Sequence, residues 1–293
     1  MSSINLPLIL TLAVFITGLI WLYDILVLAP PRKRRLAAIR QQFENVNLDD
    51  EHQKRAYNDA QLVAAREPTV VEYSKSFFPV LLLVFVLRSF ILEPFQIPSS
   101  SMEPTLNVGD FLVVNKFTYG LRLPVLNKRV IPVNDPQRGD VMVFFPPHLP
   151  DTYFIKRVIG IPGDHVEYID HVLTINGQPV EEETVALMPE HNPQYRVVRE
   201  TLGDKEYTVH KNLTPGRYSR HGSWEVPEGH YFMMGDNRDA SFDSRGWNEL
   251  NPGSAPDLAF VSEDAIVGKA VAVWMHWHPV FSLPSFEPAG RIH

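Results

Sequence analysis

The sequence predicts a mostly antiparallel β outer domain, made of a β core with an inserted β cap, that is anchored by two N-terminal transmembrane α-helices. Two observations support this fold class. Two long apolar segments precede Glu93, whereas the chain after it breaks into short runs rich in Val, Ile, Phe and Tyr between Pro, Gly, Asn and Asp. Helix and strand patterns do not alternate there, as a parallel sheet would require.

The first apolar segment is long enough to cross a bilayer. Residues 4–23 carry no charge, and at about 1.5 Å rise per residue such a helix spans a hydrocarbon core about 30 Å thick. We predict a transmembrane helix over residues 4–28. A cleavable signal peptide has a basic start, but no Lys or Arg precedes Arg32. The segment is therefore predicted to be a retained anchor.

A basic cluster after this segment predicts its orientation. Arg32, Lys33, Arg34 and Arg35 follow the apolar run closely. The positive-inside rule places such a cluster in the cytoplasm, and hence the N-terminus outside. Residues 29–75 are polar and charged and are predicted to form a solvated cytoplasmic loop.

The second apolar segment, residues 76–92, is shorter. Its sixteen residues from Phe77 to Leu92 include Arg88, and at about 24 Å of helix they also suit a buried core helix. A basic side chain near the end of a span can snorkel to the interface. We interpret the segment as a second transmembrane helix, which places residues 93–293 outside the cytoplasm, in the periplasm of a Gram-negative cell.

Composition excludes several chemistries. The chain has no Cys, so it has no disulfide, thiolate metal ligand or Cys nucleophile. Its formal net charge of -7 gives no indication of a nucleic-acid partner. His276 and His278 form an H-x-H motif, but no third ligand is identifiable. No metal or cofactor is predicted.

Strand-like runs fill the outer domain. Asn176-Gly177 stands where a type I′ hairpin turn would be, which is a strong short-range hairpin signal. The more polar stretch of about residues 166–224 is either an inserted subdomain or a long hairpin. We assign it as the cap, which leaves a core of about 93–165 and 225–275. The predicted strands lie in FLVVNKF, DVMVFF, TYFIKRVIGI, HVLTING and AIVGKAVAVW.

The serines of PSSSMEPT, residues 98–105, allow two interpretations. Ser100 to Glu103 matches the S-x-x-E capping box, so the run can begin a helix or a turn. Alternatively, one of the serines is a nucleophile, and it then requires a base.

Lys156, in the apolar run FIKRVIG, also allows two interpretations. A lysine in such a strand commonly points to water and protects a sheet edge. The alternative is a buried general base. With an ordinary pKa near 10.4, only about 0.04% of a lysine is neutral at pH 7, so burial must lower its pKa. The neighbours Phe154, Ile155 and Val158 suit such a pocket, and Ser with Lys is a known variant of the Ser/His/Asp arrangement.

A third polar motif is GDNRDASFDSR, residues 235–245. It fails the calcium-loop pattern, because Arg238 and Ala240 stand where Asp or Asn is needed. Its alternating Asp and Arg residues are instead expected to form ion pairs that hold a loop rigid.

Together and in this order, behind two apolar segments, these motifs closely resemble the bacterial type I signal peptidases of the leader peptidase kind, which are Ser/Lys dyad serine proteases. The resemblance covers nearly the whole chain. It rests on FVLRSFILEPFQIPSSSMEPTL, RGDVMVF, YFIKRVIGIPGD and GDNRDASFDSR.

The resemblance implies a membrane-bound serine endopeptidase that removes signal peptides from exported preproteins at the periplasmic side of the plasma (inner) membrane. By position, it implies that Ser101 is the nucleophile and Lys156 the general base. Ser99 would join the Ser101 backbone N–H in the oxyanion hole, and Ser241 would orient the lysine. The residues implied to support this site are Asp236, Asn237, Arg238, Asp243 and Arg245.

The family's substrates carry small residues at an Ala-x-Ala-like site, and the resemblance implies that bulky apolar residues shape the pockets for them. The expected partners are exported preproteins, membrane lipid and the protein export machinery, with no nucleic acid and no cofactor. The implied pocket residues are Phe95, Ile97, Met102, Leu106, Val143 and Ile155.

Two other functions compete with this hypothesis. One is another membrane-anchored Ser/Lys maturation peptidase, of the conjugation type. The other is a non-catalytic membrane-anchored scaffold, in which the serines cap a helix and Lys156 faces solvent. The joint presence of Ser101, Lys156 and Ser241 favours an enzyme over a scaffold.

Overall fold

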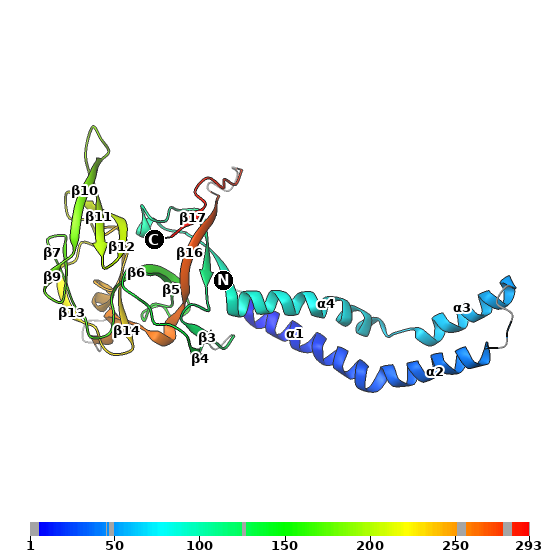
Figure 1. Cartoon of the computed structure of the whole chain (residues 1–293). Coiled ribbons are helices and arrows are strands. Elements are labelled where there is room, and N and C mark those ends of the chain that lie inside the picture. Colours follow the sequence, from blue (N-terminus) through cyan, green and yellow to red (C-terminus); the bar gives the residue numbers. More distant parts are fainter. Residues whose placement is uncertain are drawn as a thin grey trace. The chain divides into compact units, whose positions relative to one another are not determined.

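The computed structural model describes residues 6–44, 46, 50–124, 127–250, 256–277 and 283–292. His278 of the H-x-H motif lies outside the described residues. The chain forms two compact units, Met1–Arg88 and Ser89–His293 (Figure 1).

The first unit is helical. Helices α1 (Leu6–Tyr23) and α4 (Thr69–Val86) lie side by side, because Gly18 leaves room for the ring of Phe78, and Trp21 packs 5.3 Å from that ring. A π-helical segment, Asp24–Leu28, joins α1 to α2 (Ala29–Gln42), and α3 (Glu51–Ala65) follows. The stretch predicted as a cytoplasmic loop thus contains two helices.

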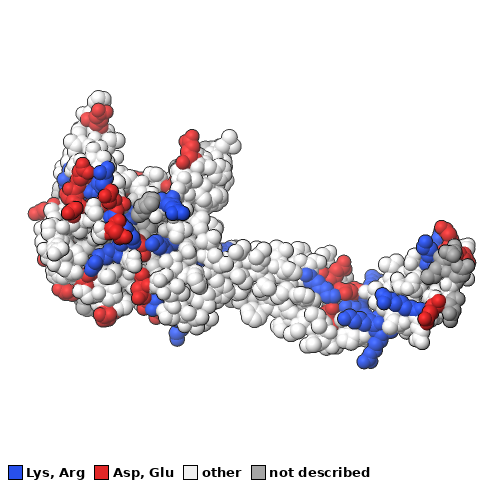
Figure 2. Space-filling model, viewed as in Figure 1, with Lys and Arg blue, Asp and Glu red and all other residues white. Residues whose placement is uncertain are grey.

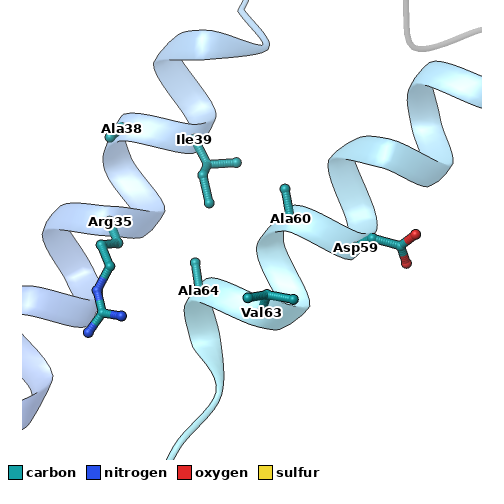
Figure 3. A pocket seen from close by; sticks show the side chains of 7 residues that line it. All are labelled: Arg35, Ala38, Ile39, Asp59, Ala60, Val63 and Ala64. Atoms are coloured by element: carbon teal, nitrogen blue, oxygen red, sulfur yellow. The ribbon is translucent and has the colours of Figure 1, made fainter.

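Two continuous helices of this unit are long and apolar enough to cross a membrane, Leu6–Gln42 and Thr69–Ile91. The second helix begins before the predicted span of residues 76–92. Its 23 residues measure about 34 Å, which is long enough to cross the hydrocarbon core of a bilayer. Charged side chains of this unit gather towards one end of it, and the rest of its visible surface is free of them (Figure 2). An open groove of about 620 Å³ between α2 and α3 is lined mostly by small apolar side chains (Figure 3).

Four charged side chains meet inside the helical unit. Arg32 donates to Asp24 at 2.6 Å, and Lys75 contacts the same carboxylate at 2.9 Å. Lys75 also pairs with Glu67 at 2.7 Å. Asp24 is 1% exposed, whereas the side chains of Lys75 and Glu67 are 30% and 31% exposed, so the cluster compensates one buried acid and has two members at the surface.

The second unit is built of antiparallel sheets, and the predicted fold class is confirmed. Its main sheet has the order β1-β2-β16-β5-β6-β14-β15, and β17 pairs with β16. Its strands are β1 (Leu92–Gln96), β2 (Asp110–Asn115), β5 (Val141–Phe144), β6 (Phe154–Gly160), β14 (His230–Met234), β15 (Val261–Ser262), β16 (Ile266–His276) and β17 (Gly290–Arg291).

Smaller sheets complete this unit. A four-stranded sheet has the order β13-β7-β8-β9, a three-stranded sheet the order β10-β11-β12, and β3 pairs with β4. The strands are β3 (Gly120–Arg122), β4 (Arg129–Pro132), β7 (His165–Ile169), β8 (Val172–Ile175), β9 (Gln178–Pro179), β10 (Glu181–Met188), β11 (Tyr195–Leu202), β12 (Lys205–Asn212) and β13 (Gly222–Glu225).

The strand predictions are confirmed, since all five strand-like runs contain a strand. At the predicted hairpin, Asn176 and Gly177 have φ of 52° and 77°, as a type I′ turn requires. The stretch 166–224 forms most of the four-stranded and the three-stranded sheet. It shares a hydrophobic core with the main sheet, in which Val198 and Val209 pack with Ile159 and Phe232.

Candidate active site

The serine run forms a tight turn at the end of a strand. After β1 the chain continues extended through Ser99 and then makes a single 3-10 turn, Ser100–Met102. Met102 is fully buried and anchors this turn in the hydrophobic core, while Ser101 is 8% exposed. The turn thereby holds the Ser101 hydroxyl at a fixed place with limited access to water.

The capping-box interpretation does not describe this turn. Its cap residue is Ser99, which makes no side-chain capping hydrogen bond. Glu103 donates its backbone N–H to the carbonyl of Ser100 at 3.1 Å, which is an ordinary turn bond.

Lys156 lies on an inner strand. Strand β6 is hydrogen-bonded on both sides, to β5 and β14, and Lys156 is only 4% exposed. The solvent-facing interpretation is therefore wrong. The amine Nζ lies 2.7 Å from the Ser101 Oγ and donates to the backbone carbonyl of Ile155 at 2.9 Å.

The surroundings of this amine destabilise its charged form. Burial lowers the pKa of Lys156 to about 8, although Asp243 and Asp236 act in the opposite direction. No carboxylate of the described residues forms an ion pair with Lys156. Desolvation therefore dominates, as expected for a buried amine without a direct counter-ion.

The motif GDNRDASFDSR packs directly against the serine turn. Asn237 donates its backbone N–H to the Ser101 carbonyl and its side-chain amide to the Ser100 carbonyl, both at 3.1 Å. Gly235 allows this approach, because a Cβ there would collide with the Ser101 carbonyl and with Ser241 Oγ. Residues more than 130 positions apart in the sequence are thus joined through the backbone.

A buried ion pair supports this loop, as its alternating charges predict. Arg245 donates to both carboxylate oxygens of Asp243 at 2.8 Å, and to the Arg238 carbonyl at 2.6 Å. Asp243 also accepts from the Gly235 N–H at 3.0 Å. Burial raises the pKa of Asp243, but Arg245 and these hydrogen bonds outweigh it and leave that pKa below its ordinary value.

A second buried pair involves a residue that the sequence analysis did not single out. Arg157 is fully buried and binds both oxygens of Asp236, at 2.9 and 2.7 Å. Thr105, four residues after Ser101, donates to the same carboxylate at 2.5 Å. The sequence did contain a sign of this burial. Neighbouring strand residues point to opposite faces of a sheet, so two adjacent basic residues in an apolar strand, Lys156 and Arg157, cannot both point to the same solvent-exposed face.

Two serines with implied roles lie near Ser101. The Ser99 hydroxyl is 3.4 Å from the Ser101 hydroxyl. Ser241 is 1% exposed. Its hydroxyl lies close enough to Asp243 to lower the pKa of that carboxyl, and it makes no closer hydrogen bond among the described residues.

The six apolar residues implied as pocket residues meet in one hydrophobic cluster. Phe95 and Ile155 are partly exposed and pack against its surface, so they are the accessible members. The fully or almost fully buried members are Ile97, Met102, Leu106 and Val143.

The described residues hold no group of three or more His, Asp or Glu side chains arranged as a metal site. His276 instead pairs with Asp110, its Nδ1 lying 2.8 Å from a carboxylate oxygen.

Comparison with known proteins agrees with these motifs. The family model "Signal peptidase, peptidase S26" matches residues 70–277. Signal peptidase I of Pseudomonas fluorescens is 49% identical over 294 residues, which covers 99% of this chain and 99% of that protein. Signal peptidase I of Haemophilus influenzae is 35% identical and covers 89% of this chain and 82% of its own length.

A crystal structure of a signal peptidase I from Enterococcus faecalis V583 is 32% identical, covering 47% of this chain and 97% of that chain, with a TM-score of 0.29. The family model spans most of the chain, and the Pseudomonas relative matches it over nearly its full length. The chain therefore belongs to the signal peptidase family, peptidase S26, and is a serine endopeptidase.

Proposed function

We propose that this membrane-anchored peptidase cleaves signal peptides from exported preproteins with Ser101 as nucleophile and Lys156 as general base. Its family and its relatives support signal-peptide cleavage. The observation that carries the catalytic assignment is the buried 2.7 Å contact between Lys156 Nζ and Ser101 Oγ.

The lowered pKa makes the base available near neutral pH. With a pKa of about 8, about one tenth of Lys156 is neutral at pH 7, against about 0.03% for a lysine of pKa 10.5. This is a gain of about 300-fold in the reactive form. A neutral amine can accept the Ser101 proton through its lone pair while its own N–H donates to the Ile155 carbonyl.

The reaction then follows the usual course of acyl transfer. Lys156 takes the Ser101 proton as Oγ attacks the scissile carbonyl carbon, and a tetrahedral oxyanion forms. The Ser99 hydroxyl and the Ser101 backbone N–H are the proposed donors to this oxyanion. The Lys156 ammonium returns the proton to the leaving amine, which is the new N-terminus of the mature protein. Water, deprotonated by Lys156, hydrolyses the acyl-enzyme and releases the signal peptide.

The supporting residues hold Ser101 and Lys156 in position relative to each other. Asp243 with Arg245, and Asp236 with Arg157, fix the loop that holds the serine turn. Ser241 lies beside Asp243, and its hydroxyl oxygen is the proposed acceptor for the remaining N–H of Lys156. Asn237 ties the loop to the Ser101 and Ser100 carbonyls.

The proposed substrate site has small residues at the first and third positions before the cut, as in Ala-x-Ala. The exposed parts of Phe95 and Ile155 pack against a buried hydrophobic cluster. Because such a core is close-packed, it cannot move aside to admit substrate side chains larger than Ala.

We further propose an inner-membrane location with the protease domain, residues 93–293, on the periplasmic side. The basic residues 32–35 support this orientation. Trp274 and Trp277 are 40% and 38% exposed, and such side chains favour the interface of a lipid membrane. The export machinery that delivers preproteins is a further proposed partner.

The direct test uses the detergent-solubilised chain and a preprotein with an Ala-x-Ala site. Wild type should cut after the second Ala, and Ser101→Ala and Lys156→Met should each abolish cutting. Lys128→Met, at an exposed position, is the matched control and should cut normally. Activity that persists in Ser101→Ala or Lys156→Met would remove the proposed mechanism.

A further inference from the structure

The sheet β10-β11-β12 buries charges on the face that it turns to the rest of the unit. Alternate residues of β11 and β12 are buried, and Val198, Leu202 and Val209 form part of the hydrophobic core. Glu200 and Lys211 lie on the same face and are fully buried. Charges in such a place are costly unless they are closely paired.

Glu200 reaches the loop that supports the active site. Its carboxylate accepts from Arg238 Nη2 at 2.5 Å and from the Tyr207 hydroxyl at 3.0 Å, and Lys211 Nζ lies 3.0 Å from its other oxygen. Arg238 belongs to the motif GDNRDASFDSR. It is fully buried, and Glu200 is the acid that pairs with it among the described residues.

Tyr207 links Glu200 to the second buried ion pair of the site, Arg157 with Asp236. It stands directly opposite Glu200 across the β11–β12 ladder. Its ring covers the guanidinium of Arg157, whose Cζ lies 3.9 Å from the ring centre. Arg157 is the residue after Lys156 and binds Asp236 with two hydrogen bonds. One cross-strand pair thus contacts both arginines that flank Asp236 in the structure of the site.

We propose that Glu200 is a positioning residue for peptide-bond cleavage: it holds Arg238 directly, and Arg157 through Tyr207, and thereby keeps Asp236 and Lys156 in place. This gives the β10-β11-β12 sheet a role in catalysis. The inference rests on the proposed function, because it takes Lys156 as the base.

Glu200 is the acid shared by two buried bases, Lys211 and Arg238. Lys211 has further partners of its own, since it also pairs with Glu182 and donates to the His171 carbonyl at 2.7 Å. An apolar side chain at position 200 would fill the same volume but would leave Arg238 buried without an acid. What Glu200 adds is a negative charge between Arg238 and Lys211, and therefore an electrostatic influence on the groups around Asp236.

The test is Glu200→Gln in the full-length chain in detergent. We expect kcat to fall about tenfold or more while KM changes less than about twofold, because the substrate pockets lie elsewhere. The variant leaves Arg238 uncompensated near Asp236, so the Lys156 ammonium becomes less favourable. The acid-side midpoint of the pH profile should therefore move to lower pH.

Two further comparisons keep the result interpretable. Glu183→Gln breaks the exposed pair with Arg199 on the same sheet and should change neither kcat nor the midpoint. Tyr207→Phe keeps the ring over Arg157 and should lose less activity than Tyr207→Leu. If Glu200→Gln does not fold, the comparison of Tyr207→Phe with Tyr207→Leu tests the positioning role in its place.

An unmoved midpoint in Glu200→Gln, or equal losses in Tyr207→Phe and Tyr207→Leu, would overturn the positioning role. Ser101→Ala must be inactive in the same assay. If it is active, the proposed function itself fails. If it is inactive while Glu200→Gln behaves like Glu183→Gln, only the positioning role fails.

Discussion

Gly235 lies against the backbone carbonyl of Ser101, with no room for a side chain between them. This contact joins the loop of charged residues to the serine turn, and Asn237 reinforces it with a backbone hydrogen bond to the same carbonyl. The position of the proposed nucleophile therefore depends on a residue that has no side chain.

Gly235→Ala should separate these two segments. The added methyl group meets Ser241 Oγ and a backbone oxygen, and the backbone cannot move aside cheaply. We expect the cleavage rate to fall about 100-fold, since small displacements of catalytic groups have effects of that order. Gly290→Ala is the control, because the nearest atom to a Cβ there is 3.9 Å away. Equal activity of the two variants would contradict this prediction.

The pH profile of kcat/KM should show an ionisation at about pH 8. Burial lowers the pKa of Lys156 to about 8, and only the neutral amine accepts the serine proton. Activity should therefore rise with pH through this value and level off above it. A profile that levels off below pH 7 instead, as a histidine base would give, would count against Lys156.

Asp243→Asn should move this ionisation to lower pH. The carboxylate of Asp243 favours the charged ammonium of Lys156 and raises its pKa, whereas Arg245 lowers it. Removing the acid leaves the arginine uncompensated, so both changes act in one direction. The rate should also fall, because the loop loses its bidentate ion pair. The measurement is the pH profile of the variant, and a midpoint that rises would show that another group controls the ionisation.

Arg157→Met should be strongly destabilising. Breaking a fully buried ion pair leaves Asp236 as an uncompensated charge, which costs about 3–5 kcal/mol. Thermal unfolding of the variant in detergent, compared with wild type, measures this loss. Arg199→Met breaks an exposed pair with Glu183 and should change stability by less than about 1 kcal/mol. Similar losses in both variants would argue against the importance of burial.

Single cysteines can test the proposed orientation, because the natural chain has none. His52→Cys lies on the exposed surface of α3, and Ser223→Cys on the exposed surface of β13. In intact spheroplasts, a membrane-impermeant maleimide should label Ser223→Cys only. After permeabilisation it should label both. The reverse pattern would invert the proposed topology.

The sequence predicted much of the fold because its strands are short, β-branched and clearly separated, and because Asn176-Gly177 admits one kind of turn. It did not predict how the stretch 166–224 contacts the site. Glu200 and Tyr207 look like surface residues in two strands of mixed polarity, and only the packing of the sheet shows them buried. Lys156 was ambiguous for the same reason, since strand order decides whether a strand is an edge.

The contact between Ser101 and Lys156 could be predicted only from the family resemblance. The two residues are 55 positions apart in the sequence, and the sequence around each one fits a structural role as well as a catalytic one. Arg157 was overlooked although it stands beside Lys156. Its partner Asp236 is far away in the sequence, and no local pattern joins the two.

The four-charge cluster of the helical unit has a consequence for how the two apolar helices enter a membrane. Asp24 follows the first helix, its partner Arg32 lies in α2, and Glu67 and Lys75 lie at or near the start of the second. The segment 24–32 carries one acid and one base, whereas the segment 67–75 carries Glu67, Glu72 and Lys75. The close network forms only when the two segments meet, so the cluster favours pairing of the two helices over their separate diffusion in the lipid.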